Sequence, residues 1–582
     1  MKRSALLIAL VAGLSCSDAF ALRQRGDYPW KSSCGSWQEK EMFDAIGPCW
    51  YLPVGPTGIR SQITTEYPQY FTIRYVFKNS PAAGKVRIGD IIVGANGTML
   101  TRPHSFAKSS KSWDGPMVDM ARLIEDSQGK DGKLKLIIWP GGKNEAQKTV
   151  TVQIEAVGRF SPTFPYNCKR SEKLVNKLCD FLASDLHRKD ASKGGFTDLH
   201  MILALMASGD KKYDPIIKGF VARLAAGKPD PRKGGKANWG NAYKGIVLGE
   251  YYKLTKDKSV LPTIKSLAQC YDDAMDHGRG AYSHHPTPSL WINNSKGYGA
   301  MAAPAGLSML AMSVFKGAGV EFQEKAYNEL HQSYLRSATP DVMSIVYCFP
   351  VSPDHAAITL ENPNLAKTDA GPGFRVPTGM KGIGKYTIGW PTPGEKRKFH
   401  LGPAGTDTSW VQKEKDTNDV YMFFKNRPAQ RIVVRTNVLP EPTKPYKTTK
   451  ACAQAPVGLG ALANSIGNKD KQSWQYLAEH CGNSCALGYG TWFDGHASAG
   501  MHHLWVGLGA SRAEKENFRK FMDGVKWWFI MQQTHDGSYF NCPNRDRPTG
   551  ANKNYGPHDL ASANTALILS LPRRVLQITG AE

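Results

Sequence analysis

Several common features are missing from this sequence, and each absence narrows what the protein can be. After residue 21 there is no run of about 20 apolar residues, so we expect no membrane-spanning helix in the mature chain. No five or six basic residues occur in a row, which gives no indication of specific nucleic-acid binding. The Gly-x-Ser-x-Gly, P-loop and His-Glu-x-x-His signatures are also absent. The sequence therefore indicates no cofactor.

The N-terminus predicts export. Lys2 and Arg3 precede the apolar run 5–14, and Ala19-Phe20-Ala21 then provides a cleavage site. This order is typical of a secretory signal peptide over residues 1–21, with cleavage after Ala21. A lipoprotein anchored at Cys16 is the alternative, although Gly13 fits that pattern poorly. We expect a secreted or periplasmic protein.

The charge and the cysteine content suggest what an exported chain of this kind would bind and whether it would contain disulfides. The net charge of +24 suits an acidic partner such as an anionic polysaccharide, and a solvated basic surface is the alternative. Of eleven cysteines, ten follow residue 21, and an even number in an exported chain permits disulfides. Proximity in sequence predicts three pairs, with buried free thiols as the alternative: Cys34/Cys49, Cys168/Cys179 and Cys481/Cys485. Cys481 and Cys485 have no second pair at zinc-finger spacing, so we predict no metal site.

Residues 51–155, which follow an unassigned extension over 22–50, carry the most specific pattern. Phe71, Ile73 and Tyr75 alternate as in a strand, and Ser80–Gly84 predicts a short helix that ends at glycine. Asn96-Gly97 predicts a tight turn, Met117–Asp126 an amphipathic helix and Lys133–Trp139 a strand. Together these pieces resemble a PDZ domain of the bacterial exported type.

The resemblance implies a peptide site. Gly55, Pro56, Thr57, Gly58 and Ile59 stand where PDZ domains keep their carboxylate-binding loop. An exported protein or peptide would add as a strand beside the helix at 117–126. Pro56 and Thr57 depart from the usual loop, so the alternative is a PDZ fold used only for internal docking.

The remainder predicts paired helices. Six stretches rich in small residues each follow a more charged helical pattern, at a spacing of about 50 residues. The small-residue stretches are 197–209, 239–254, 298–319, 451–467, 492–510 and 558–572, and the charged ones are 171–188, 213–226, 259–275, 321–335, 472–480 and 513–533. This repetition resembles an α/α toroid such as those of polysaccharide lyases and terpene cyclases.

The predicted fold class is therefore multi-domain: a small α+β PDZ domain, then an all-α toroid of six hairpins over 160–582. The toroid is interrupted at about 345–447 by a Pro- and Gly-rich stretch with β-like runs at 344–349, 420–424 and 430–436. Trp528, Gln533, Gly537 and Tyr539 resemble the structural glutamine-and-tryptophan repeat of terpene cyclases. The acidic DxDD and DDxxD clusters of that group are absent, so its activity is not implied.

The toroid resemblance implies a ligand site where the inner helices begin. The catalytic candidates are His277, Asp494 and His496, because histidine and carboxylate side chains move protons. The ligand-binding candidates are polar or aromatic residues near the same helix starts: Asp198, His200, Trp239, Arg279, His284, Asp536, Tyr539 and Asp559. The alternative for the aspartates at helix starts is capping, and for the histidines a structural role.

Two functions follow. The first is an exported binding protein whose PDZ module docks a partner while the toroid holds a glycan or peptide. The second is a carbohydrate-active lyase or hydrolase that acts on an anionic polysaccharide.

Overall fold

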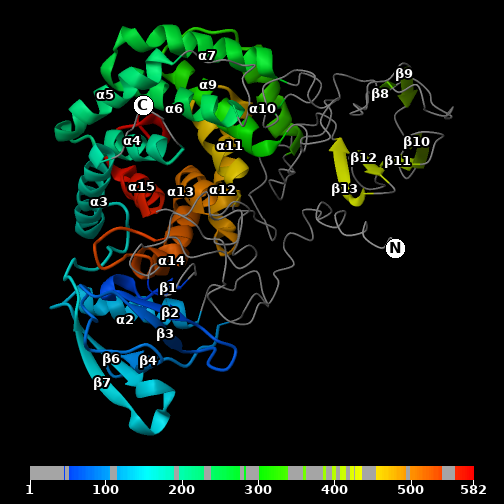
Figure 1. Cartoon of the computed structure of the whole chain (residues 1–582). Coiled ribbons are helices and arrows are strands. Elements are labelled where there is room, and N and C mark those ends of the chain that lie inside the picture. The colour runs from blue at the N-terminus through cyan, green and yellow to red at the C-terminus, as the bar shows by residue number, and fades with distance from the viewer. Residues whose placement is uncertain are drawn as a thin grey trace, which may run out of the picture.

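The chain has an α+β part followed by a mostly helical part (Figure 1). A computed structural model describes residues 45, 51–104, 115–188, 196–227, 237–275, 281–282, 301–337, 454–492, 499–540 and 558–582. It also describes the backbone of further strands between residues 358 and 434.

The first part contains a seven-stranded antiparallel sheet with the order β1-β2-β3-β4-β6-β7, and β5 pairs with β4. Asn96 and Gly97 both have positive φ, 53° and 79°, and join β4 to β5 as the predicted tight turn. The strands are β1 (Leu52–Pro53), β2 (Ile59–Gln62), β3 (Phe71–Val76), β4 (Ile91–Ala95), β5 (Thr98–Met99), β6 (Lys133–Trp139) and β7 (Lys148–Gln153).

Helix α2 (Pro116–Gln128) packs its apolar face against this sheet. Met120 and Ile124 lie one turn apart on that face and are fully buried. The predicted short helix at Ser80–Gly84 is absent, because this segment forms successive turns. Ala83 N donates to Ser80 O at 3.0 Å, and Gly84 takes a φ of 71°, which ends the winding.

The helical part has two layers. Its inner helices are α4 (Phe196–Ser208), α6 (Ala237–Thr255), α9 (Ala302–Gly317), α11 (Ala455–Ile466), α13 (Leu504–Ala510), which continues the π-helical turn Ala499–His503, and α15 (His558–Leu569). Each packs against the next in this order, and α15 packs back against α4. The flanking helices are α3 (Lys169–Arg188), α5 (Asp214–Ala226), α7 (Leu261–Ala274), α10 (Lys325–Ser337), α12 (Gln472–Leu487) and α14 (Lys515–Met531).

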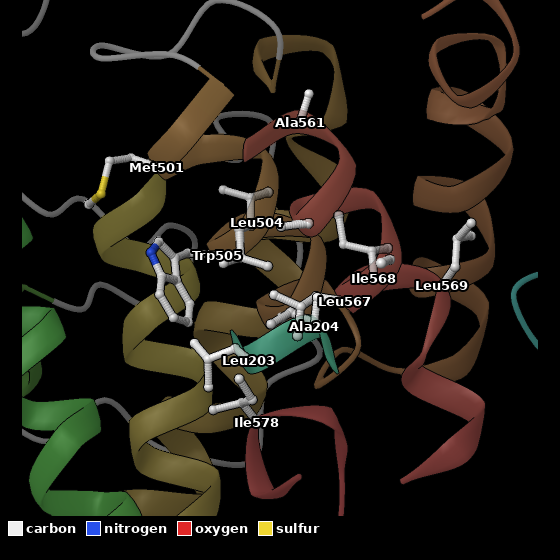
Figure 2. Close-up of a cluster of buried hydrophobic side chains, with 14 of the residues drawn as sticks. Leu203, Ala204, Met501, Leu504, Trp505, Ala561, Leu567, Ile568, Leu569 and Ile578 are labelled. Atoms are coloured by element: carbon white, nitrogen blue, oxygen red, sulfur yellow. The ribbon is translucent and has the colours of Figure 1, made fainter. Parts of the chain in front are cut away.

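Glycine permits the closest of these contacts. A Cβ on Gly509 of α13 would lie 2.5 Å from the Cα of Gly458 on α11. A Cβ on Gly507 would lie 2.5 Å from Ile568 of α15. Gly509 therefore allows the close approach of α11, and Gly507 allows that of α15. Helices therefore approach α13 from more than one side. Figure 2 shows the apolar core that results, where Leu203, Trp505 and Ile568 meet from α4, α13 and α15.

The predicted insertion contains strands. β10 (Lys396–Leu401), β11 (Asp407–Lys413), β12 (Val420–Phe424) and β13 (Arg427–Val434) form a four-stranded antiparallel sheet, and β8 (Ile358–Glu361) pairs with β9 (Lys385–Ile388). β12 coincides with the predicted run 420–424 and β13 overlaps the run 430–436, while the run 344–349 lies outside the described residues.

Two of the predicted disulfides do not form. Cys168, Cys179, Cys481 and Cys485 are buried free thiols. Cys168 precedes α3 and Cys179 lies three turns into it, about 16 Å further along the axis. Cys481 and Cys485 are one turn apart on α12, where Cβ atoms lie about 5–6 Å apart against the roughly 3.5–4.5 Å of a disulfide. Cys34 and Cys49 lie outside the described residues.

No described helix is long and apolar enough to cross a membrane. Within the same described ranges, no group of three or more His, Cys, Asp or Glu side chains is arranged to hold a metal ion.

Candidate functional site

The predicted peptide-binding loop lies inside the molecule. Gly55–Thr57 form a 3-10 turn, and all five residues from Gly55 to Ile59 are buried. The backbone N–H of Ile59, which a peptide carboxylate would need, donates to the Thr57 hydroxyl at 3.1 Å. Strand β1 pairs with β2 along the edge where a peptide would add. This differs from the predicted open groove, because the chain itself occupies that edge.

Helix α14 covers the same region (Figure 1). A Cβ on Gly55 would lie 3.0 Å from Ile124 of α2 and 3.3 Å from the carbonyl oxygen of Ile530 on α14. Lys526 of α14 lies 3.5 Å from the Glu125 carboxylate of α2. The ring of His535, just after α14, stacks on Phe77 at 4.9 Å between centroids. The sheet part thus docks on the helical part through the surface predicted to take a peptide.

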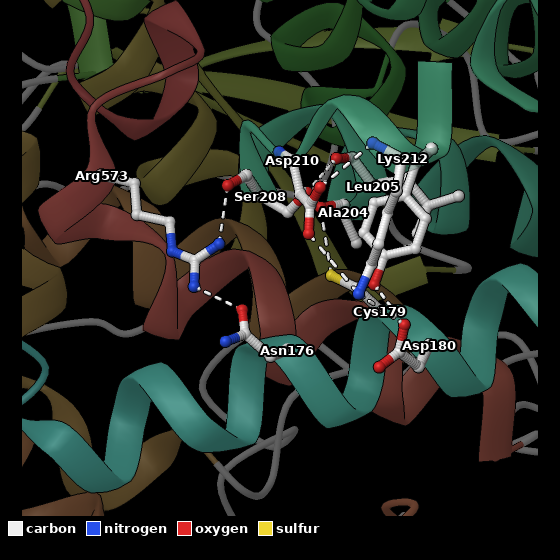
Figure 3. Close-up of polar contacts among 10 residues, drawn as sticks. Asn176, Cys179, Asp180, Ala204, Leu205, Ser208, Asp210, Lys212 and Arg573 are labelled. Carbon is white, nitrogen blue, oxygen red and sulfur yellow. Dashed lines mark hydrogen bonds and ion pairs between the residues drawn. The ribbon is translucent and has the colours of Figure 1, made fainter. Parts of the chain in front are cut away.

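The C-terminal segment closes one end of the inner helices. Arg573 donates to the Ser208 carbonyl oxygen at 2.6 Å and to Asn176 at 2.7 Å (Figure 3). Gln577 donates to the Val314 carbonyl oxygen near the end of α9 at 3.1 Å. Leu576 and Ile578 are fully buried. Residues 571–579 therefore cover the end where the inner helices finish.

A buried carboxylate holds this segment in place. Glu250 of α6 is fully buried and accepts the backbone N–H groups of Gln577 and Ile578 at 3.0 and 2.9 Å. Burial raises the pKa of Glu250 to about 7, against the lowering effect of these N–H groups and of Arg512. Arg512 itself donates to the carbonyl oxygens of Gln577 and Ile578.

At the opposite end, where the inner helices begin, aromatic and polar side chains of α4, α6 and α13 meet. His200 and Tyr243 are in ring contact with each other and with both Phe196 and Trp505, with 4.6 Å between the centroids of Phe196 and Tyr243. Trp505 donates its indole N–H to the Tyr243 hydroxyl at 3.0 Å, and that hydroxyl donates to the Met501 sulfur at 3.3 Å.

His200 is fully buried in this group. Its Nδ1 lies 2.7 Å from Oδ1 of Asn564 on α15. Burial lowers the pKa of His200 to about 4, so the ring is neutral at physiological pH. A neutral imidazole does not offer a positive charge to an acidic sugar.

A second polar cluster lies at the start of α15. The Asp536 carboxylate accepts from Ser538 N at 2.9 Å, from Ser538 Oγ at 2.7 Å and from the Thr534 hydroxyl. Ser538 Oγ also lies 2.9 Å from Nδ1 of His558, the first residue of α15. Desolvation would raise the pKa of Asp536, but the hydroxyl hydrogen bonds and nearby His558 outweigh it and lower the pKa to about 2.

The other predicted residues divide into three groups. Asp198, Trp239 and Asp559 are half-buried near the starts of α4, α6 and α15. Tyr539 is fully buried and donates to the Phe529 carbonyl oxygen at 2.7 Å, which is a structural role. The remaining candidates lie outside the described residues: His277, Arg279, His284, Asp494 and His496.

Ser538 is not among the predicted site residues, and His558 is included only as the first residue of the predicted small-residue stretch 558–572. The signal in the sequence is the Asp-Gly-Ser turn, in which Asp536 and Ser538 stand two positions apart. Its link to His558 depends on the fold, because twenty residues separate Ser538 from that histidine.

A depression elsewhere on the surface, about 490 Å³ in volume, does not coincide with these clusters. It lies over α11, α12 and the segment after α13, and two cations and two carboxylates line it: Lys469, Arg512, Glu479 and Glu514.

Residues 171–338 and 455–580 match the family described as "Domain of unknown function (DUF6288)". The two matched segments cover the inner helices and make up just over half of the chain. No curated protein and no solved structure matches the chain.

Proposed function

Because the chain belongs to DUF6288, a family whose description assigns no activity, we propose its function from its own residues. The protein is an exported binding protein that holds a glycan or peptide at the end of the helical part where the inner helices begin. The observation that carries this proposal is the asymmetry of the two ends. Residues 571–579 cover one end, while aromatic, histidine and carboxylate side chains gather at the other.

The proposal includes a finer account of the fold. The order of contacts from α4 through α15 and back to α4, with a second helical layer outside, supports an α/α toroid. The strand order, the turn at Asn96-Gly97 and the place of α2 support a PDZ-like sheet part. Burial of Gly55–Ile59 supports internal docking as its role, in place of capture of an outside peptide.

The chemistry at the helix starts suits a sugar better than an extended peptide. Trp239 and Phe196 are half-buried aromatic residues near the starts of α6 and α4, and Asp198 and Asp559 are half-buried carboxylates near the starts of α4 and α15. Aromatic rings stack on sugar faces and carboxylates accept from hydroxyl groups. The net charge of +24 supports an anionic polysaccharide as the polymer that carries the sugar. The N-terminal pattern supports export, which would bring the protein to such polymers.

A second candidate function is a lyase or hydrolase on the same polysaccharide. It is favoured by the contact series from Asp536 through Ser538 to His558, which resembles the orientation of a base by a third group. The two functions share one site and differ only in whether a product is released.

One experiment separates them. Purified mature protein is tested against a panel of neutral and anionic polysaccharides, with binding and the release of reducing or unsaturated ends both recorded. Trp239→Ala should weaken binding at least tenfold, whereas Tyr252→Ala removes a half-buried aromatic from the other end of the same helix and should leave binding unchanged.

Binding without product supports the binding protein, and product lost in Asp536→Asn with binding retained supports the enzyme. This site would be rejected if wild-type protein binds no polysaccharide, or if Trp239→Ala and Tyr252→Ala lose the same amount of binding affinity.

A further inference from the structure

A short hairpin after α14, residues 532–540, carries the exposed carboxylate of Asp536. The hairpin is closed by the hydrogen bond from Thr534 N to Ser538 O at 2.8 Å, and Asp536 lies at its tip, next to His535. The Asp536 carboxylate accepts from the hydroxyl groups of Thr534 and Ser538 in the same hairpin. It therefore moves with the hairpin, and its position depends on what fixes the tip.

The helical part holds the second arm of this hairpin. Tyr539 donates its N–H to Ser562 Oγ of α15 at 3.0 Å and its hydroxyl to Phe529 O of α14 at 2.7 Å. Ser538 Oγ lies 2.9 Å from Nδ1 of His558. All these contacts come after the tip, so they fix one arm and do not by themselves fix the tip.

The sheet part contacts the hairpin on both sides of Asp536. Before it, the ring of His535 stacks on Phe77, which follows β3, with 4.9 Å between centroids and 26° between planes. After it, the guanidinium of Arg60 on β2 lies over the ring of Phe540 at 5.2 Å. The same guanidinium lies over the Phe77 ring at 5.0 Å, so one cluster joins both contacts.

These contacts are shielded from water. Arg60 and Phe540 are fully buried, and Phe77 is 3% exposed. Cation–π contacts are stronger when the cation is desolvated, and aromatic pairs contribute beyond the area that they bury. Because a two-stranded hairpin is only marginally stable by itself, loss of the cluster should loosen the tip.

We propose that the sheet part is a positioning module for the site at the inner-helix starts, in which Phe77 and Arg60 hold the hairpin 532–540 so that the Asp536 carboxylate meets the bound sugar. The ligand half of this inference rests on the proposed function. Phe77 and Arg60 are positioning residues, because they act on the ligand only through the hairpin. This role agrees with the burial of Gly55–Ile59, which docks the sheet part on the helical part.

The inference names the group that Asp536 recognises. Its pKa is lowered to about 2, chiefly by hydroxyl hydrogen bonds that outweigh desolvation, so the carboxylate is ionised at neutral pH. An ionised carboxylate only accepts, so it selects a sugar hydroxyl and repels the acid group of an anionic polysaccharide.

Hydrogen exchange, read by mass spectrometry on full-length mature protein, tests the structural half. Phe77→Leu removes the ring on which His535 stacks. Exchange of the amides in residues 532–540 should accelerate by about tenfold, the factor for loss of one strong ring contact. Unchanged exchange in this hairpin overturns the proposal.

Phe71→Leu is the matched control. Phe71 is also a buried phenylalanine of the sheet part, paired with Ile92 of β4, but it begins β3, about 20 Å of extended chain before Phe77. This variant should accelerate exchange in α2 and leave the hairpin 532–540 as in wild type. Equal acceleration of the hairpin in both variants overturns the proposal, because the hairpin would then follow general stability alone.

A double-mutant cycle separates a specific contact from a general structural effect. His535→Ala removes the other ring of the stacked pair. If both residues act through that pair, the double variant Phe77→Leu/His535→Ala should show hairpin exchange no faster than the faster single variant. Effects that multiply in the double variant would show that the two residues act independently, which overturns the stacked pair as the cause.

The ligand half is tested by binding, with polygalacturonate as the anionic probe and dextran as the neutral one. Phe77→Leu should weaken whichever interaction the wild type shows by about tenfold, as for one lost charge-assisted hydrogen bond. In an Asp536→Asn background the same substitution should change binding no further. Thermal unfolding of each variant confirms that it folds.

The outcomes keep the two proposals apart. Wild-type binding that Phe77→Leu leaves unchanged overturns the positioning role and spares the proposed function. If the wild type binds neither these probes nor any other polysaccharide, the ligand half falls with the proposed function, while hydrogen exchange still decides whether the sheet part holds the hairpin.

Discussion

His200 on α4 and Asn564 on α15 lie 364 positions apart in the chain, yet their side chains meet at 2.7 Å. They join the first inner helix to the last, which closes the order of contacts among the inner helices. Oδ1 of Asn564 accepts from Nδ1–H of His200, and both side chains are buried. The bond therefore bears on the stability of the whole helical part.

Asn564→Leu should destabilise the protein by about 1–3 kcal/mol, because it leaves the buried N–H of His200 without its acceptor. Urea unfolding measures the free energy of unfolding. Thr565→Val is the matched control, since the Thr565 hydroxyl donates to Ala561 O within the same helix. Equal losses of unfolding free energy in the two variants would mean that the His200–Asn564 contact has no special part in joining α4 to α15.

Acid should destabilise the protein through two histidines. Burial lowers the pKa values of His200 and His331 to about 4, below their ordinary 6.5. Their contribution to the free energy of unfolding is complete above pH 6.5 and is lost as the pH falls through 4. For the fully buried His200 this loss reaches about 3 kcal/mol. His200→Gln should reduce the dependence of the unfolding free energy on pH between 6.5 and 4. A slope identical to that of the wild type would contradict this.

Glu250 should act in the opposite direction. Its pKa is raised from 4.5 to about 7. Its contribution to the free energy of unfolding is therefore complete below pH 4.5 and is lost as the pH rises through 7. The difference in unfolding free energy between wild type and Glu250→Gln should change by about 3 kcal/mol from pH 4.5 to pH 8. Glu516→Gln alters an exposed carboxylate paired with Lys520 and should leave the slope unchanged over the same range. If the difference in unfolding free energy between wild type and Glu250→Gln stays constant from pH 4.5 to pH 8, Glu250 is not responsible for this pH dependence.

The periodic parts of the fold could be predicted from the sequence, and the contacts between distant parts could not. The small-residue stretch 492–510, which includes Gly507 and Gly509, predicted the helix α13, and the alternation in 71–75 predicted β3. The burial of Gly55 was not visible, because it depends on Ile530, far away in the chain. For the same reason, the Asp-Gly-Ser turn could be read as local structure, while its bond to His558 could not.

The docking of the sheet part on α14 can be tested with two glycines. Gly55 and Gly84 both have positive φ, 55° and 71°. A Cβ on Gly55 meets Ile124 and Ile530, whereas a Cβ on Gly84 meets nothing within 4 Å. Both alanine variants carry the cost of backbone strain, about 1 kcal/mol, but only Gly55→Ala should also loosen the interface. Hydrogen exchange should accelerate in α2 and α14 for Gly55→Ala alone, and equal acceleration in both variants would count against the interface.

The thiols provide the last prediction. Cys179 of α3 is buried and lies 3.7 Å from the Ala204 carbonyl oxygen, and burial raises its pKa to about 12. Burial also raises the pKa of Cys481, so neither thiol ionises near neutral pH. Because the thiolate is the reactive form, an alkylating reagent at pH 8 should label both cysteines in unfolded protein and neither in the native state. Mass spectrometry of protein unfolded without reductant should find Cys168, Cys179, Cys481 and Cys485 all alkylated. A peptide that links Cys168 to Cys179, or Cys481 to Cys485, would show that export oxidises these pairs and that α3 or α12 must distort to bring their Cβ atoms within bonding distance.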